Sequence, residues 1–354
     1  MGSKLKTAAA LATVGVVAAR IVAQQNRAYD LRGKVVFITG ASRGLGLVLA
    51  RQLLREGVTK LAICARDAVE LEHARQELEQ RGAKVLALLC DVTDRDQVNR
   101  TVRQIIAHYG TIDVLINNAG IIQIAPSEVM TQEWDEAMRT HYWAPLYAIR
   151  AVLPEMKRKN DGRIVNIASI GGKISTPHMV PYCSSKFALV GLSHGLRAEL
   201  AEDGVVVITV CPPLVRTGGF YRSVFKGRHR LEFTIGNIAN ANPLFSISSE
   251  QAAQRIIKSL KRGDAETVLS KRAQVLTTIV ALFPGLTSDV LALANRLLPQ
   301  PDGPDSIGTR RASGIESTTP TSESALTTLN QIAYDENNQQ QHEGAVAPPH
   351  RTAP

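Results

Sequence analysis

Aromatic side chains and paired cysteines are both scarce in this chain of 354 residues. Phe, Trp and Tyr together make up 5% of it, and neither a zinc-finger spacing nor an aromatic RNA-binding signature accompanies the basic charge. Nucleic acid is therefore not expected as a partner, and no metal site is predicted. The cysteines show no paired spacing, which favours reduced thiols in a cytosolic environment over disulfides. They are Cys64, Cys90, Cys183 and Cys211.

The apolar run near the N-terminus is short for a bilayer span, which takes roughly 20 apolar residues. It extends over residues 7–23, is interrupted by Arg20 and follows Lys4 and Lys6. No A-x-A cleavage site is evident. We predict residues 1–30 as an N-terminal apolar segment, and two interpretations stay open: a membrane anchor, or a helix that docks on the protein.

The net charge of +9 is distributed unevenly. Residues 300–354 hold seven acidic and three basic side chains, a net charge of −4, so the rest of the chain carries +13. This tail is rich in Ser, Thr, Pro, Gln and Asn, and it has too few large apolar residues to offset the entropy of ordering a chain. We predict that residues 300–354 form a disordered tail.

Short apolar runs alternate with helical patterns from residue 34 onward. The apolar runs are KVVFIT, LAICA, KVLALLC, VLINN, RIVNIAS and VVVITVC. Runs that are apolar on both faces suit a parallel sheet covered by helices. The predicted fold class is α/β, with a doubly wound parallel sheet of the Rossmann type.

A basic and irregular stretch follows the last of these runs, between Pro213 and Ser248. It contains four of the seven phenylalanines of the chain. A long segment after a late strand of such a sheet lies near the carboxyl ends of the strands, where ligands bind. We predict that this stretch is a substrate lid, with Phe220 and Phe225 as substrate-binding residues.

Residues 271–299 show two apolar helical patterns separated by Pro284 and Gly285. Lys271 and Arg272 lie at the start of the first pattern. We predict an apolar helical hairpin, and its role stays open between two interpretations. It packs on the domain or on a second subunit, or it inserts into a membrane face, where the basic residues favour anionic lipid.

A glycine-rich motif, TGASRGLG, spans residues 39–46, directly after a predicted strand and at the start of a predicted helix. Glycines at such a turn let the backbone approach a pyrophosphate closely, and the start of the helix adds a favourable dipole. Further along, Tyr182 and Lys186 lie four residues apart, so they share one face of a helix. Ser169 lies 13 residues before Tyr182, at the end of the strand RIVNIAS.

Over residues 31–270 these motifs resemble the short-chain dehydrogenase/reductase superfamily, with its TGxxxGxG, NNAG and Ser-Tyr-x-x-x-Lys patterns. The resemblance implies an oxidoreductase that transfers a hydride between NADP(H) and a hydrophobic alcohol or carbonyl compound. It also implies that Tyr182 exchanges the proton and that Ser169 hydrogen-bonds the substrate oxygen. Lys186 is then expected to hold the nicotinamide ribose and to lower the pKa of Tyr182, together with the oxidised nicotinamide.

In the family that these motifs resemble, the residue that closes the second strand reads the adenosine ribose, and a neutral residue followed by Arg selects NADP. This chain has Ala65 and then Arg66 at that place, with Arg43 in the glycine loop, so the resemblance implies NADP(H). Two guanidinium groups suit a 2′-phosphate, and no carboxylate at this position repels it. By the resemblance, Asp91 contacts the adenine. The expected cofactor-binding residues are Gly40, Ser42, Arg43, Gly44, Leu45, Gly46, Arg66, Asp91, Val92, Asn118, Ala119, Gly120, Tyr182, Lys186, Val215 and Thr217.

Two positions depart from the pattern of the family. His141 stands where the family usually has an Asn that supports a water in the proton relay. Three interpretations stay open: His141 substitutes for the Asn, it alters the pH dependence of the reaction, or it is a packed helix residue. Pro213 stands where the family commonly has a glycine, which stiffens the turn, although Val215 and Thr217 still match. These departures motivate the main alternative, a nucleotide-binding scaffold or regulator with little turnover; a membrane-tethered adaptor is a third hypothesis.

The substrate class is expected to be steroid-, retinoid- or lipid-like, which points to lipid metabolism, and the residues do not separate these classes. We expect the protein at the cytoplasmic face of a membrane or, alternatively, free in the cytoplasm. The family often forms homodimers or tetramers through helices that correspond to residues 133–159 and 182–201, so such an assembly is expected here by resemblance.

Overall fold

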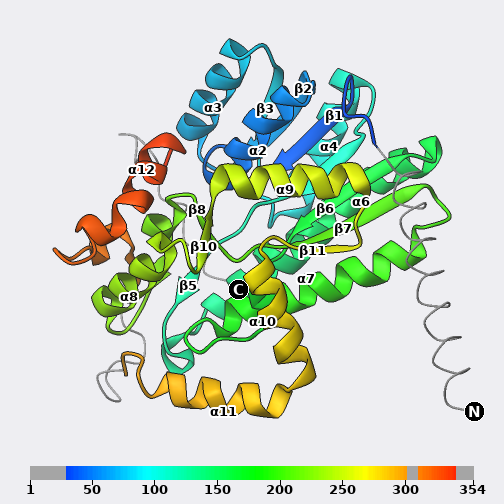
Figure 1. The fold of residues 1–354 in the computed structure, drawn as a ribbon. Coiled ribbons are helices and arrows are strands. Elements are labelled where there is room, and N and C mark those ends of the chain that lie inside the picture. The colour runs from blue at the N-terminus through cyan, green and yellow to red at the C-terminus, as the bar shows by residue number, and fades with distance from the viewer. Residues whose placement is uncertain (1–28, 301–309, 340–354) are drawn as a thin grey trace, which may run out of the picture.

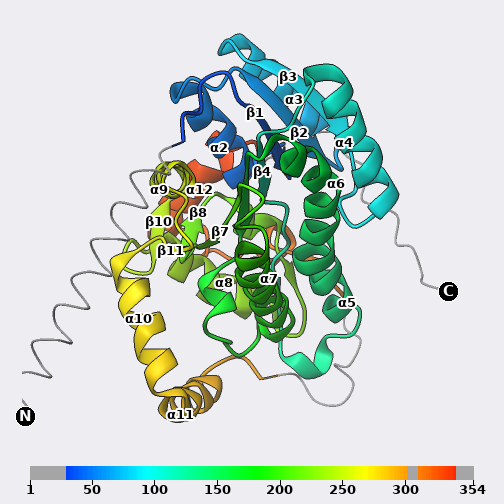
Figure 2. The same ribbon diagram turned by 90° about the vertical axis from the view of Figure 1, so that its right-hand side faces the viewer.

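The computed structural model describes residues 29–300 and 310–339 (Figure 1). Its centre is a seven-stranded sheet with the strand order β11-β7-β6-β4-β1-β2-β3, in which all neighbours are parallel. Helices cover both faces (Figure 2), which confirms the predicted doubly wound α/β fold. The strands are β1 (Val35–Thr39), β2 (Lys60–Ala65), β3 (Lys84–Leu89), β4 (Val114–Asn117), β6 (Gly162–Ile167), β7 (Val205–Cys211) and β11 (Glu266–Val268).

Successive residues of the central strand β1 point into two separate hydrophobic cores, because side chains alternate across a strand. Val36 and Ile38 pack in the core under the helices of one face, and Val35 and Phe37 pack in the core under those of the other. Both faces of the strand are therefore buried, which is why its sequence reads as a continuous apolar run. The first face carries α2 (Gly44–Arg55), α3 (Ala68–Gln80) and α9 (Ser249–Arg262), and the second carries α4 (Arg95–Tyr109), α6 (Ala144–Lys159) and α7 (Val180–Glu199).

The chain between β7 and α9 is the segment predicted to be a substrate lid, and we call it the lid; its structure is more regular than predicted. Two of its strands, β8 and β10, pair in parallel with each other. A third, β9, pairs with the short strand β5, which follows β4 in the chain. The lid thereby lies at the carboxyl end of the sheet, as expected (Figure 1). The lid consists of β8 (Leu214–Arg216), β9 (Val224–Phe225), α8 (His229–Ala241) and β10 (Ser246–Ser248). It contacts β5 (Gln123–Ile124) and α5 (Glu133–Met138), which come earlier in the chain.

The predicted helical hairpin is present as α10 (Lys271–Leu282) and α11 (Pro284–Asn295), with a bend of 112° between the two helices. Both helices expose large apolar side chains, namely Val275, Leu276, Ile279, Leu282, Leu286, Val290 and Leu293. Within the described ranges no single helix is long and apolar enough to cross a membrane, whereas this bent pair passes the same criteria of length and composition when it is taken together.

The prediction of a disordered tail over 300–354 is wrong for residues 310–339. They form β12 (Ala312–Ser313), three-residue helical turns and α12 (Thr328–Glu336). β12 pairs antiparallel with β9, and α12 lies beside α8 (Figure 1). This segment is ordered although it has few large apolar residues, because it packs on a core that the lid already supplies. Ile315 and Tyr334 pack onto the apolar cluster of the lid. Residues 301–309 and 340–354, like the N-terminal segment 1–28, lie outside the described residues.

Candidate active site

The glycine loop joins β1 to α2 and is built for close backbone contacts. A Cβ atom on Gly46 would lie 2.4 Å from the carbonyl oxygen of Gly40, so this position accepts only glycine. The side-chain amide of Asn118 donates hydrogen bonds to the carbonyl oxygens of Thr39 (3.0 Å) and Gly40 (2.9 Å), which ties the loop to the end of β4. The loop therefore presents the start of α2 as a fixed group of backbone amides, which fits the pyrophosphate of a dinucleotide.

An arginine pair surrounds one buried carboxylate at the side of this loop. Arg43 donates to Glu70 at 2.6 Å, and Arg222 of the lid donates to the same carboxylate at 3.0 Å. The Glu70 side chain is 1% exposed. Two guanidinium groups paired with one carboxylate leave this group with a net charge of +1. A third arginine, Arg66, is exposed at the end of β2. Sequence reasoning identified Arg43 and Arg66 but missed Glu70 and Arg222, which no motif marks.

The residues expected around the adenine and at the end of β4 also lie at the carboxyl edge of the sheet. Asp91 follows β3, and its carboxylate accepts hydrogen bonds from the backbone amide (3.0 Å) and the hydroxyl (2.8 Å) of Thr93. Val92 is buried beside it. The backbone amide of Ala119 donates to the hydroxyl of Thr39 at 3.1 Å. The structure thus brings the predicted cofactor residues of four neighbouring strands to one edge, where α/β proteins bind ligands.

The Ser-Tyr-Lys group stands at the same edge, on β6 and α7. Ser169 follows β6 and accepts a hydrogen bond from the amide of Gly171 at 3.0 Å. Tyr182 is the third residue of α7, and a Cβ on Gly171 would lie 2.9 Å from its ring. Lys186, one turn later, donates to the carbonyl oxygen of Ile167 at 2.9 Å, and its Nζ lies 5.8 Å from the centre of the Tyr182 ring. The three side chains predicted to be catalytic are therefore assembled together.

The protonation of this group follows from its burial. Burial raises the pKa of Tyr182 to about 12, against the opposing effect of a hydrogen bond with Ser169. Burial lowers the pKa of Lys186 to about 7. At neutral pH Tyr182 is therefore protonated, as a tyrosine with an ordinary pKa also is, and burial makes loss of its proton harder until other groups oppose it. The lowering of the pKa of Tyr182 by Lys186 and the oxidised nicotinamide stays a prediction.

His141 lies in a short stretch of π-helix between α5 and α6 and links two parts of the site. Its Nε2 accepts a hydrogen bond from the amide of Ile121 (3.1 Å), so the neutral ring carries its proton on Nδ1, which faces the Ser185 hydroxyl at 2.8 Å. That hydroxyl donates to the carbonyl oxygen of Tyr182 at 2.7 Å. Burial, with the charge of Lys186, holds the pKa of His141 well below its usual range. His141 is therefore uncharged at neutral pH and joins the loop after β4 to the helix that carries Tyr182, the predicted catalytic acid.

The predicted substrate-binding phenylalanines form the interior of the lid. Phe220 and Phe225 are buried together with Phe233, with ring centres 5.5 to 5.8 Å apart. These rings form the buried apolar core of the lid. Direct contact of Phe220 and Phe225 with a substrate stays a prediction. Phe245, by contrast, is 62% exposed and stands outside this cluster.

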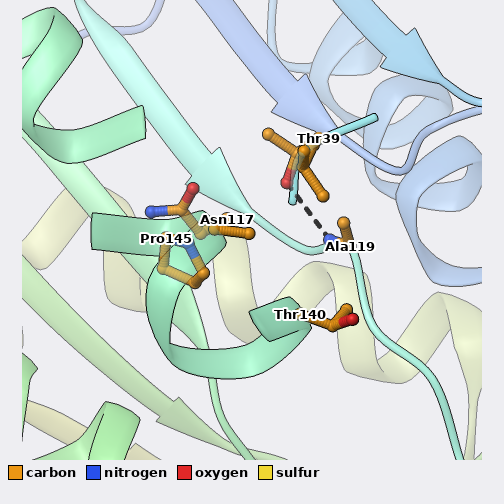
Figure 3. A pocket seen from close by; sticks show the side chains of 7 residues that line it. Thr39, Asn117, Ala119, Thr140 and Pro145 are labelled. Carbon is orange, nitrogen blue, oxygen red and sulfur yellow. Dashed lines mark hydrogen bonds between the residues drawn. The ribbon is translucent and has the colours of Figure 1, made fainter. Parts of the chain in front are cut away.

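A small pocket lies next to residues 117–120, which match the NNAG pattern, between β4 and the start of α6 (Figure 3). Thr39, Asn117, Ala119, Thr140 and Pro145 line it. It has no room for a water molecule, so it is not a substrate site. Its side chains instead pack the end of β4 against the helix that carries His141.

The end of the ordered tail reaches the glycine loop, a contact that no motif predicts. The backbone amide of Gly44 donates a hydrogen bond to the carbonyl oxygen of Asn337 at 2.9 Å. The side-chain amide of Asn338 donates to the carbonyl oxygen of Ser42 at 2.8 Å, and that of Gln339 donates to the carbonyl oxygen of Thr217 at 3.2 Å. Three residues far away in the sequence thus belong to the candidate site.

Comparison with known proteins agrees with this geometry. Residues 34–224 match the family model for short chain dehydrogenases. A protein of Streptomyces violaceoruber assigned as a ketoacyl reductase of the granaticin polyketide synthase is 35% identical over 248 residues, 68% of this chain and 91% of that protein. The 3-oxoacyl-[acyl-carrier-protein] reductase of Staphylococcus aureus is 31% identical over 183 residues, 51% of this chain and 74% of that protein. The crystal structure of a short-chain type dehydrogenase/reductase from Mycobacterium marinum matches with a TM-score of 0.59 and 27% identity, over 68% of this chain and 95% of that one.

Proposed function

Because the chain belongs to the short-chain dehydrogenase/reductase family and is an oxidoreductase of that family, we propose that it transfers a hydride between NADP(H) and a hydrophobic carbonyl or alcohol compound. The observation that carries the proposal is the assembly of Ser169, Tyr182 and Lys186 beside the glycine loop, at one edge of the sheet. NADPH supplies the hydride when it is bound.

The proton step follows from the protonation of Tyr182. A carbonyl oxygen that gains negative charge needs a proton donor within hydrogen-bond reach. Tyr182 is protonated at neutral pH and offers its hydroxyl, and Ser169 offers a second hydrogen bond to the same oxygen. Lys186 is fixed by its hydrogen bond to the carbonyl oxygen of Ile167 and places a basic nitrogen next to the tyrosine ring. In the reverse direction the same groups accept the proton of an alcohol.

The cofactor preference is the first test of this proposal. We expect Arg66→Ala to raise the KM for NADPH about tenfold or more, because hydrogen bonds from a guanidinium to a phosphate are charge-assisted. The KM for NADH should stay the same, since NADH lacks the 2′-phosphate. Arg75→Ala is the matched control, because Arg75 is an arginine of α3 whose side chain pairs with Glu72 and Glu79. Initial rates with both cofactors measure the effect; a wild-type preference for NADH, or equal losses with both cofactors, would contradict NADP dependence.

For the substrate, we propose a lipid-like carbonyl compound. The lid has an apolar interior, and the relatives include proteins named as ketoacyl and 3-oxoacyl reductases, which supports an acyl chain with a keto group as the first class to test. Steroid and retinoid carbonyl compounds belong to the same panel. Homodimer or tetramer formation stays a prediction from the family.

We further propose that the hairpin of α10 and α11 docks on anionic membranes from the cytoplasmic face. Its exposed apolar side chains and the adjacent Lys271 and Arg272 support this role. We expect the protein to sediment with vesicles that contain phosphatidylserine, and the double substitution Leu282→Ser and Leu286→Ser to reduce the bound fraction several-fold. The matched control is Leu326→Ser, at an exposed leucine of the tail. Equal sedimentation of all three proteins would argue for the alternative, a protein free in the cytoplasm.

A further inference from the structure

We propose that residues 328–339 form an internal seal over the cofactor cleft, in which the last three residues hold the backbone groups that a nicotinamide dinucleotide would use. The proposal rests on the proposed function, since it takes the ligand of the cleft to be NADP(H). We call residues 337–339 the tip of the seal and residues 328–336 its base.

The first contact of the tip lies at the phosphate end of the cleft. Gly44 is the first residue of α2, and its amide points to the place where a helix start attracts an anion. The carbonyl oxygen of Asn337 accepts a hydrogen bond from this amide at 2.9 Å. A pyrophosphate oxygen at the start of α2 needs the same donor, so the two acceptors compete.

The second contact joins the glycine loop to Thr217, whose Cβ lies 3.9 Å from the position of a Cβ atom on Gly44. Gln339 donates from its carboxamide nitrogen to the carbonyl oxygen of Thr217 at 3.2 Å. The same nitrogen lies 2.8 Å from the position of a Cβ atom on Gly44, so it fills the gap between the glycine loop and the lid. Thr217 is one of the positions expected to reach the nicotinamide carboxamide. Gln339 therefore offers at this place the same functional group, a primary carboxamide, that the cofactor carries.

The arginine pair near the adenosine end also contacts the tip. Arg222, which pairs with Glu70, donates through its Nε to the backbone carbonyl oxygen of Gln339 at 2.6 Å. Asn338 donates to the carbonyl oxygens of Ser42 (2.8 Å) and Glu70 (3.3 Å). The tip thus uses donors and acceptors of the glycine loop and of the lid residues next to it.

The base and the tip of the seal are held by different kinds of contact. In the base, the buried Asn330 donates to the side-chain oxygen (2.6 Å) and the backbone oxygen (2.9 Å) of Asn237, and the Tyr334 ring packs edge-on against Tyr221, with ring centres 5.0 Å apart. One buried oxygen lacks a hydrogen-bond partner among the described residues in each part, Oδ1 of Asn330 in the base and Oε1 of Gln339 in the tip. The difference lies in apolar packing: Tyr334 of the base packs on the apolar cluster of the lid, whereas the tip consists of polar residues only. The base is therefore the firmer anchor, and the tip can leave its site while the base stays on the lid.

A seal of this kind raises the apparent Kd for the cofactor by the reciprocal of the fraction of molecules in which the tip is released. If the tip occupies the cleft in about nine molecules out of ten, only one in ten is competent to bind, and the apparent Kd for the cofactor is about tenfold higher than that of the open form. Cofactor binding and tip release are then linked, so that saturating NADPH opens the seal.

The test compares two C-terminal truncations of the full chain. One ends at residue 336 and lacks the tip, and the control ends at residue 339 and lacks only residues 340–354. We expect the first to bind NADPH about tenfold more tightly than the full chain in a fluorescence titration, and the control to bind like the full chain. The double substitution Asn338→Ala and Gln339→Ala in the full chain, which keeps the chain length, should tighten binding about threefold. Unchanged or weaker binding in both the truncated and the substituted protein would overturn the seal.

Hydrogen exchange separates this proposal from the proposed function. The peptide that contains the Gly44 amide should be protected in the full chain and in the control truncation, and it should exchange faster once the tip is removed. This readout needs no cofactor. Unchanged exchange would overturn the seal, whereas faster exchange in a protein that binds neither NADPH nor NADH would contradict the proposed function and leave the contact of the tip established.

Discussion

Replacing Tyr182 by Phe is expected to lower kcat/KM for carbonyl reduction by about 10³-fold, because the variant keeps the ring and loses the proton donor. A positioned general acid contributes typically 10²- to 10⁴-fold to a rate. The ring itself packs against Gly171 and lies in edge-on contact with His141, at 5.3 Å between ring centres, and Phe preserves both contacts. Steady-state rates at saturating NADPH measure the effect, and the Kd for NADPH should change less than about threefold.

The control for Tyr182→Phe is Tyr109→Phe. Tyr109 ends α4, and its hydroxyl donates to the carbonyl oxygens of Leu61 and Lys84, away from the catalytic group. The Tyr109→Phe substitution also removes a tyrosine hydroxyl, but from a residue outside the candidate site, so we expect it to leave kcat unchanged. If Tyr182→Phe retained more than about a tenth of the wild-type rate, Tyr182 would not be the proton donor.

Replacing Gly46 by Ala is expected to abolish cofactor binding at millimolar NADPH and to lower the free energy of unfolding by about 1–3 kcal/mol, the usual cost of forcing extra atoms into a packed site. The added Cβ would lie 2.4 Å from the carbonyl oxygen of Gly40 and 2.6 Å from the side-chain amide of Asn118. The backbone of the loop must shift to admit it, which breaks the link between the loop and β4. Thermal unfolding and an NADPH titration measure the two effects.

Gly191→Ala is the matched control for this substitution. Gly191 lies within α7, and a Cβ atom at this position meets nothing within 4 Å. Because alanine is favoured over glycine in a helix, this variant should be as stable as the wild type or more stable by about 0.5–1 kcal/mol. Wild-type affinity for NADPH in Gly46→Ala would show that the glycine loop does not shape the cofactor site.

Much of the fold was predictable from the sequence because its strongest signals are local. The strands of a parallel sheet are buried on both faces, and they appear as apolar runs that need no knowledge of their neighbours. The glycine loop and the spacing of Tyr182 and Lys186 are likewise contained in a few adjacent residues. Ser169 was found at the end of its strand for the same reason.

The parts that were missed depend on contacts between distant residues. Glu70 looks like any acidic residue in the first turn of a helix, and only the fold brings Arg43 and Arg222 to it. The tail has a composition typical of disorder, but Tyr334 packs on apolar residues of the lid. Buried polar residues of the tail, such as Asn330, form hydrogen bonds with the lid. Composition describes what a segment can bury by itself, so it misjudges a segment that is completed by another surface.

The most direct test of hydride transfer is an isotope experiment with NADPH deuterated at both C4 positions. The protein is incubated with this cofactor and a panel of 3-oxoacyl thioesters, steroid ketones and retinaldehydes, and the products are analysed by mass spectrometry. We predict an alcohol product with one deuterium on the carbinol carbon, formed by the wild type and nearly absent with Tyr182→Phe. Binding of NADPH without deuterium in any product, from either protein, would contradict the proposal and favour a nucleotide-binding scaffold.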